Sequence, residues 1–270
     1  MNARVGAPQD DLSAHREAPR LQLRGIGLRR QQRDVLSNVN LDVAPGELVS
    51  ILGASGAGKS TLLRIAAGLI APHAGSVRVD GTSLDGARPD VALAFQDACL
   101  LPWLSVERNV AFGLGFRKQP RLPRQEREAR VHAALQAVGL AHAARFAPRQ
   151  LSGGMAQRAA LARALARAPR TLLLDEPFGA LDEVTRADMQ RLLVGIVRES
   201  RAATLLVTHD IDEALRVSDR VAVLGPQGIA LDLAIALPEP RADHIEASEA
   251  LRVRLVAALH ATMARAPRPV

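Results

Sequence analysis

The chain has 270 residues, 48% of them hydrophobic and 23% charged, which is enough to bury a sizeable core in one globular unit. A single cysteine, Cys99, excludes an internal disulfide, and no apolar run approaches the roughly 18 residues that cross a bilayer. The net charge of +7 is nearly all arginine, but aromatic residues make up only 2%, which argues against a nucleic-acid partner whose bases are stacked. We expect a cytoplasmic protein that does not bind nucleic acid.

The predicted elements begin after a disordered lead over residues 1–20. Alternating apolar residues at 39–43 and 77–79 predict strands of an antiparallel sheet near the start of the chain. Four short apolar runs are typical of buried, mostly parallel strands: 48–52, 91–95, 172–174 and 204–207. Helical periodicity between these runs, at 131–138 and 192–197, makes the expected fold class α/β.

A chemical group follows each of the four buried runs. In chain order these groups are Gly53, Gln96, Asp175 with Glu176, and Thr208 with His209. Ligands of open α/β sheets bind at the carboxyl ends of the strands. The sequence therefore predicts that all four strand ends contribute to one site.

The segment after the first run fits the phosphate-loop pattern of glycine, four residues and then Gly-Lys-Ser. It consists of Gly53, Ala54, Ser55, Gly56, Ala57, Gly58, Lys59, Ser60 and Thr61. Glycines let backbone N–H groups face phosphates, the lysine reaches the β and γ oxygens, and the serine hydroxyl meets Mg²⁺. The pattern indicates a site for ATP and Mg²⁺, with a chance glycine turn as the alternative.

Two adjacent carboxylates end the run 172–174. Asp175 suits the shell of the magnesium ion, and Glu176 is placed to orient or deprotonate the attacking water. An apolar run that ends in Asp-Glu is also common as a simple capped strand. The catalytic interpretation therefore depends on the phosphate loop that accompanies it.

A second cradle for an anion is predicted at the start of another helix. Ser152, Gly153, Gly154 and Met155 precede apolar residues at helical spacing, so the serine and the glycine N–H groups lie at a helix N-terminus. An ordinary capping turn would account for Ser152 and one glycine, but not for the pair.

Taken in order, these motifs resemble the ATP-binding subunits of ABC transporters from about residue 21 to residue 237. The matching segments are the Walker A loop at 53–61, the Q-loop Gln96, the signature motif at 151–155, the Walker B strand at 172–176, the D-loop Gly179-Ala180-Leu181-Asp182 and the switch histidine His209. The resemblance implies a P-loop ATPase core with a parallel central sheet, an N-terminal antiparallel β-subdomain, an inserted helical subdomain at about 100–168 and a C-terminal helical tail at 238–270.

The resemblance also implies a homodimer that holds two ATP molecules between its subunits. The residues expected to reach the nucleotide on the partner subunit are Ser152, Gly153, Gly154, Met155 and Asp182. By the same resemblance Glu176 is the general base, His209 contacts the γ-phosphate, and Ser60, Gln96 and Asp175 hold Mg²⁺. Taken alone, Gln96 would be an ordinary loop residue and His209 a residue at the start of a helix.

Two positions depart from the family pattern. Met155 stands where the family usually has glutamine, which puts in doubt a hydrogen bond on the ribose side. The family usually stacks an aromatic ring on adenine from the segment before 35–36. This segment has no aromatic residue here, and the candidates for stacking are Arg29, Arg30 and Arg33. We expect the guanidinium of Arg30 to stack on the base, with weaker discrimination between ATP and GTP.

The segment 97–110 carries Leu-Leu-Pro-Trp at 100–103 and resembles importers of the nitrate, sulfonate and taurine group. Trp103 is either an anchor for the permease or a core residue of the helical subdomain. The resemblance implies integral-membrane permease subunits, a periplasmic or lipid-anchored solute-binding protein, and a peripheral location at the cytoplasmic face of the bacterial inner membrane. Alternatives are another solute, a soluble ABC ATPase acting on ribosomes or DNA, and a non-hydrolysing nucleotide binder.

Overall fold

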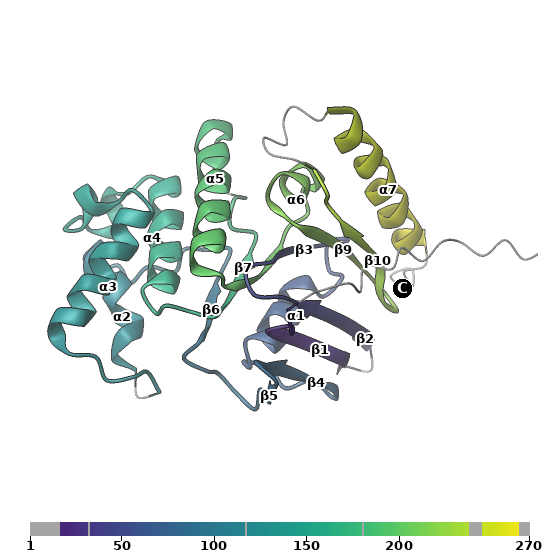
Figure 1. The fold of residues 1–270 in the computed structure, drawn as a ribbon, viewed down its shortest axis with the longest axis horizontal. Coiled ribbons are helices and arrows are strands. Elements are labelled where there is room, and N and C mark those ends of the chain that lie inside the picture. The colour runs from purple at the N-terminus through teal and green to yellow at the C-terminus, as the bar shows by residue number, and fades with distance from the viewer. Residues whose placement is uncertain (1–16, 32, 117, 180, 238–244, 265–270) are drawn as a thin grey trace, which may run out of the picture.

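The computed structural model describes residues 17–31, 33–116, 118–179, 181–237 and 245–264. Two sheets form its centre (Figure 1). One has four strands in the order β2-β1-β4-β5, and the other has six in the order β10-β9-β3-β8-β7-β6. The expectation of disorder over 1–20 concerns mainly residues 1–16, which lie outside the described ranges.

The four-stranded sheet is antiparallel, as predicted for the start of the chain. Its strands are β1 (Leu21–Arg30), β2 (Arg33–Val43), β4 (Ala74–Val79) and β5 (Thr82–Ser83). Leu21 pairs with Val43 on one side and with Val79 on the other, and all three side chains are buried. One apolar face of this sheet therefore joins the core.

The six-stranded sheet is built around the four predicted buried runs. These runs form β3 (Leu48–Leu52), β6 (Val91–Ala94), β7 (Thr171–Asp175) and β8 (Ala203–Val207), and all four are parallel. Every residue of β3, β7 and β8 is buried, which explains why these strands are continuously apolar rather than alternating. The sequence prediction lacked the two strands at the far edge, β9 (Arg220–Gly225) and β10 (Gly228–Ala234).

The helices next to the sheet follow the strands that carry the predicted functional groups. They are α1 (Lys59–Ala66), α5 (Glu183–Ser200) and α6 (Ile211–Val217), which come after β3, β7 and β8. This order places the start of each helix near the carboxyl end of its strand, where an α/β sheet binds ligands.

A separate group of helices lies at one end of the molecule, beyond α5 (Figure 1). It contains α2 (Val106–Phe112), α3 (Arg124–Ala137) and α4 (Gly153–Leu165), with short 3₁₀ turns at Gly113–Gly115, Ala141–Ala143 and Pro148–Gln150. We call α2, α3 and α4 the helical group. These helices and the two sheets together make the fold α/β, as the sequence predicted.

The last helix, α7 (Ile245–Ala264), lies at the opposite end of the molecule from the helical group (Figure 1). Leu255 on α7 is fully buried in a cluster with Leu215 of α6 and Leu52 of β3. Within the described residues, no helix combines the length and the apolar character needed to span a membrane.

Candidate functional site

The carboxyl ends of β3, β6, β7 and β8 meet at one edge of the sheet, and their side chains contact one another. The hydroxyl of Ser60 donates to Oδ1 of Asp175 over 2.9 Å. Nε2 of Gln96 donates to Oε2 of Glu176 over 3.2 Å, and Nδ1 of His209 lies 3.3 Å from Oε1 of the same carboxylate. The structure therefore joins residues that are far apart in the sequence.

The backbone of the phosphate loop depends on glycine at two positions. Gly56 has a φ of 79°, and Gly58, which precedes the first residue of α1, has a φ of 92°. A Cβ atom at Gly58 would lie 2.8 Å from the carbonyl oxygen of Val35, so no side chain fits there. The loop can take the left-handed turns that direct N–H groups at an anion because these residues lack side chains.

Lys59 folds back over the loop that precedes it. Its Nζ donates to the carbonyl oxygens of Gly53 at 2.9 Å and Ala54 at 3.1 Å, and only 7% of the residue is exposed. Burial lowers the pKa of Lys59, and the nearby carboxylates of Glu176 and Asp175 act in the opposite direction. The ammonium is thus held at the centre of the loop, where a phosphate oxygen would meet it.

The pair formed by Ser60 and Asp175 fits a magnesium ion. Burial raises the pKa of the Asp175 carboxyl, while the hydrogen bond from Ser60 lowers it. Mg²⁺ binds through one or two protein oxygens and takes its other ligands from phosphates and water. In the described part of the chain no three His, Cys, Asp or Glu side chains cluster as a metal site. This donor set therefore suits a nucleotide-bound magnesium ion rather than a cage made of protein alone.

Glu176 has an unusual backbone conformation. Its φ is 45°, in the left-handed region that non-glycine residues avoid, and its backbone N–H donates to the carbonyl oxygen of Val207 at 2.9 Å. The side chain lies between Gln96 and His209. Strained residues of this kind cluster at active sites, where the surrounding structure holds them in place. The sequence identified Glu176 but gave no sign of this geometry.

The predicted second anion cradle lies at the start of α4. The Ser152 hydroxyl caps this helix by accepting from the backbone N–H of Met155 at 3.2 Å. Gly154 packs so closely against α5 that a Cβ atom there would lie 2.6 Å from Cγ2 of Thr185. Gly153 is the first residue of α4, so its N–H group belongs to the same exposed helix end.

Asp182 caps the neighbouring helix α5. Its carboxylate accepts from the backbone N–H of Thr185 at 3.0 Å and from the Thr185 hydroxyl at 2.7 Å, and the backbone bond is the main cause that lowers the pKa of Asp182. Thr185 therefore links the predicted signature and D-loop segments, a role that the sequence reasoning missed. The spacing Asp-x-x-Thr, typical of a helix cap, was the available signal. Ala180 of the D-loop lies outside the described residues.

Two side chains of α4 hold the backbone that follows Gln96. Nε2 of Gln157 donates to the carbonyl oxygen of Gln96, and the guanidinium of Arg163 donates to the carbonyl oxygens of Ala98 and Cys99 over 2.7 Å each. Burial lowers the pKa of Arg163. The predicted signature helix is therefore directly bonded to the predicted Q-loop, a link that the sequence reasoning missed.

The next loop is fixed by a buried amide. Asn109 is fully buried, and its side chain accepts from the N–H of Leu101 and donates to the carbonyl oxygens of Leu101, Leu104 and Ser105. Trp103 lies within this loop and is 74% exposed. The alternative that Trp103 is a core residue of the helical group is therefore wrong, because the loop turns its ring to the surface.

Arg30 lies at the end of β1, in the hairpin next to the phosphate loop. It pairs with Arg33 across the hairpin, and both are exposed. Arg29 instead forms an exposed ion pair with Asp34, with 2.8 Å between Nε and Oδ1. The close approach of Val35 to Gly58 puts this hairpin beside the nucleotide loop.

Comparisons with known proteins agree with this geometry. A family model described as ABC transporter matches residues 36–179. Aliphatic sulfonates import ATP-binding protein SsuB 1 of Xanthomonas axonopodis pv. citri is 50% identical over 244 residues, covering 89% of this chain and 96% of that protein. Aliphatic sulfonates import ATP-binding protein SsuB 2 of Burkholderia lata is 45% identical over 263 residues, covering 96% and 93%.

Solved structures show the same similarity. The ATP-binding cassette MJ0796, solved as a dimer in a post-hydrolysis state bound to ADP and Pi, has a TM-score of 0.71 at 33% identity and covers 80% of this chain and 98% of its own. The structure of cbiO1 from Clostridium perfringens has a TM-score of 0.74 at 28% identity and covers 88% and 96%. From the motifs, the fold and these similarities, the chain belongs to the ABC transporter family as an ATP-binding subunit.

Proposed function

We propose that this chain hydrolyses ATP to power an importer of aliphatic sulfonates. The observation that carries the chemistry is the placement of Glu176 between Gln96 and His209, next to the pair formed by Ser60 and Asp175. The solute follows from the relatives, which are named as ATP-binding proteins of aliphatic sulfonate import.

In the proposed mechanism the phosphate loop binds the phosphates of ATP through its N–H groups and Lys59. Ser60, Asp175 and Gln96 would hold Mg²⁺, which would neutralise charge on the phosphates when bound. Glu176 accepts a proton from the attacking water, and His209 donates a hydrogen bond to the γ-phosphate. Lys59 stabilises negative charge that develops during phosphoryl transfer.

The active assembly in this proposal is a homodimer. Each subunit contributes a second cradle to the nucleotide that its partner binds, made of Ser152, Gly153, Gly154, Met155 and Asp182. The cap at Ser152 supports this role because it fixes the helix end whose N–H groups would meet a γ-phosphate.

The membrane side of the proposal consists of integral-membrane permease subunits and a periplasmic or lipid-anchored solute-binding protein. The chain would act from the cytoplasmic face of the bacterial inner membrane as a peripheral subunit. An exposed tryptophan on a loop fixed by Asn109 supports a permease contact at Trp103, because rigid aromatic side chains are frequent anchors of interfaces. The proposed domain division is an ATPase domain over 21–237, including the helical subdomain at about 100–168, followed by a tail over 238–270.

Arg30 is proposed to stack on the nucleotide base. A guanidinium stacks on either purine, so we expect the Michaelis constants for ATP and GTP to agree within about fivefold, because a difference of up to about 1 kcal/mol in stacking on the two bases corresponds to that factor. Steady-state hydrolysis of both nucleotides measures this. A strong preference for ATP would contradict the proposal. Arg30→Ala is expected to raise the Michaelis constants for both nucleotides, and its matched control Arg78→Ala, at an exposed arginine of β4, is expected to leave them unchanged.

The test of the transport function is to tag the chain, solubilise membranes gently and identify the proteins that copurify. Recovery of a polytopic permease encoded beside a sulfonate-binding protein is the expected result. A permease associated with a binding protein for another solute would overturn the sulfonate assignment. Recovery with ribosomes or DNA and without a membrane protein would overturn transport and leave the ATPase chemistry intact.

A further inference from the structure

A large cavity lies outside the ATP site. Its volume is about 740 Å³, and its lining comes from α3, the end of α4 and the segment after it, the end of α5, and Arg20. Arg170 and Arg201, which line it, come just before β7 and β8. The cavity is therefore at the amino ends of these strands, whereas Glu176 and His209 lie at their carboxyl ends. We call it the arginine cleft.

The arginine cleft combines an apolar surface with positive charge. Leu165, Ile196 and several alanines supply the apolar part. The charged side chains in the lining are Arg20, Arg130, Arg170 and Arg201, against the single carboxylate of Glu199. A cavity of this size is within the roughly 300–1,000 Å³ typical of small-molecule sites. The lining suits a ligand that has a hydrocarbon part and a negative charge.

All four arginines have carboxylate partners outside the lining, and Arg20 and Arg170 share one of them, Asp80. Arg170 lies 3.2 Å from Asp80, Arg201 2.6 Å from Glu17 and Arg130 2.9 Å from Glu126. All three pairs are partly exposed, and exposed ion pairs contribute little free energy. Each guanidinium carries five N–H donors, so donors remain for an additional anion.

Arg20 fixes the position of two segments that border the cleft. Its Nη1 donates to the carbonyl oxygen of Arg201 at 2.7 Å and to that of Arg170 at 3.4 Å, and its Nε lies 3.4 Å from Oδ1 of Asp80. These bonds tie the residues before β7 and β8 together. The charged rim of the cleft is therefore built on a rigid part of the core.

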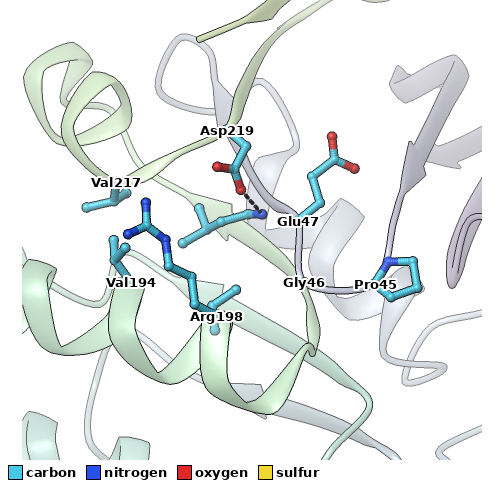
Figure 2. A pocket seen from close by; sticks show the side chains of 9 residues that line it. Pro45, Gly46, Glu47, Val194, Arg198, Val217 and Asp219 are labelled. Carbon is cyan, nitrogen blue, oxygen red and sulfur yellow. Dashed lines mark hydrogen bonds between the residues drawn. The ribbon is translucent and has the colours of Figure 1, made fainter. Parts of the chain in front are cut away.

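A smaller cavity on the other side of α5 shows the contrast. It measures about 300 Å³ and carries two carboxylates, Glu47 and Asp219, with one arginine, Arg198. Figure 2 shows Arg198 reaching toward Val217 and Asp219, whose carboxylate accepts from the backbone N–H of Leu48 at 2.8 Å. Its charge does not favour an anion, so the two cavities differ in the ligand that their linings suit.

We propose that the arginine cleft binds an alkyl sulfonate from the cytoplasm and that the bound molecule slows ATP hydrolysis. The planar guanidinium donates two parallel hydrogen bonds to oxyanions, and the apolar lining receives the alkyl chain. The choice of a sulfonate among organic anions rests on the proposed function, since the imported solute then reaches this face of the subunit. An occupant contacts both the helical group and the core, so it resists movement of one against the other.

The experiment uses the full purified chain, with octanesulfonate and butanesulfonate as ligands and octyltrimethylammonium as the cationic control. Calorimetric titration measures binding, and MgATP hydrolysis is followed at the same ligand concentrations. Each buried methylene adds about 0.8 kcal/mol, or up to roughly fourfold, so octanesulfonate is expected to bind at least about tenfold more tightly than butanesulfonate. The cation is expected not to bind, and hydrolysis is expected to fall as octanesulfonate occupies its site.

Three variants locate the site. Arg170→Ala removes one guanidinium and is expected to weaken octanesulfonate binding about tenfold. Ala137→Trp fills the cleft from an exposed position on α3 and is expected to abolish binding while basal hydrolysis continues. Arg127→Ala removes an exposed arginine of the same helix that does not line the cleft, and it is expected to bind octanesulfonate as the unmodified chain does.

Equal binding of octanesulfonate and the cation, or unchanged binding by Ala137→Trp, would overturn the proposal. So would binding at the cleft that leaves the rate of hydrolysis unchanged, since the regulatory part would then be wrong. These outcomes are independent of the transport assignment. If the copurified permease transports another solute while octanesulfonate binds and inhibits through the cleft, the solute assignment fails and the anion site stands.

Discussion

Glu213 is buried on α6, close to the strand end that carries His209. Only 6% of the residue is exposed, and its carboxylate accepts a hydrogen bond from the Thr208 hydroxyl at 2.6 Å. Burial is the main cause that raises the pKa of Glu213 above the ordinary value of 4.5, while the bond from Thr208 lowers it in part. The folded protein therefore holds this proton more tightly than the unfolded chain.

The sign of the pH effect follows from that difference. Below pH 4.5 the carboxyl is protonated in both states and its contribution to stability is fully present. As the pH rises from there through the raised folded pKa, the unfolded chain loses the proton first, so the free energy of unfolding decreases. We expect Glu213→Gln to lack this decrease, and urea unfolding at a series of pH values measures it. Parallel profiles for the variant and the unmodified chain would contradict the expectation.

At the scale of single residues, the sequence predicted which side chains the structure brings together but not how they are held. Lys59, Ser60, Gln96, Asp175, Glu176 and His209 were predictable because they follow apolar runs that form parallel strands. The bond from Gln157 to Gln96 was not predictable, because its acceptor is a main-chain carbonyl that leaves no trace in residue type. The same holds for the two carbonyl groups that Arg163 binds.

At the scale of elements, the loop between β6 and α2 depends on one side chain. Asn109 bonds four backbone groups at Leu101, Leu104 and Ser105. Asn109→Ala leaves buried polar groups without partners, and we expect it to reduce the free energy of unfolding by about 2–3 kcal/mol. Urea unfolding measures the loss.

The control for this change is Arg108→Ala, at an exposed position on the same helix. Surface substitutions of this kind usually change stability by within about 0.5 kcal/mol. If Asn109→Ala and Arg108→Ala had the same effect, the amide would not be what holds the loop. The position of Trp103 would then need another explanation.

The elements were predictable only in part from the hydrophobic pattern, since β9 was missed although five of its six residues are buried. β3, β7 and β8 are short apolar runs bounded by turn residues, and all three were expected as buried parallel strands. β10 was missed because only two of its seven residues are buried, so its hydrophobic pattern is a weak signal. The exposure of Trp103 depends on the loop that Asn109 organises. The hydrogen bonds of Asn109 to that loop could not be predicted from any local sequence pattern.

At the scale of the whole molecule, the proposed site combines the groups of one chain for binding and for chemistry with a second cradle that the partner of the proposed homodimer would supply. We expect Glu176→Gln to bind MgATP while its hydrolysis falls by about 10²–10⁴-fold, because the amide cannot take a proton from water. The ATP-bound dimer should then persist long enough to be seen. Size-exclusion chromatography with MgATP measures the dimer, and phosphate release measures the rate.

The control is Glu183→Gln, a change at an exposed carboxylate in the first turn of α5. It is expected to hydrolyse MgATP at the normal rate and to show no lasting dimer. Undiminished turnover by Glu176→Gln would remove Glu176 from the role of base. If Glu176→Gln remained monomeric at saturating MgATP, the proposal that each subunit contributes a cradle to its partner's nucleotide would be contradicted.

The left-handed backbone of Glu176 sets thermal stability against catalysis at this position. A residue with a side chain pays roughly 1–2 kcal/mol to hold such a φ, whereas glycine holds it without that penalty. Directed evolution that selects for heat resistance alone would therefore favour Glu176→Gly, a variant that lacks the proposed general base. A selection for thermostable variants of this protein therefore needs a second selection for ATP hydrolysis, which would remove sequences with glycine at 176.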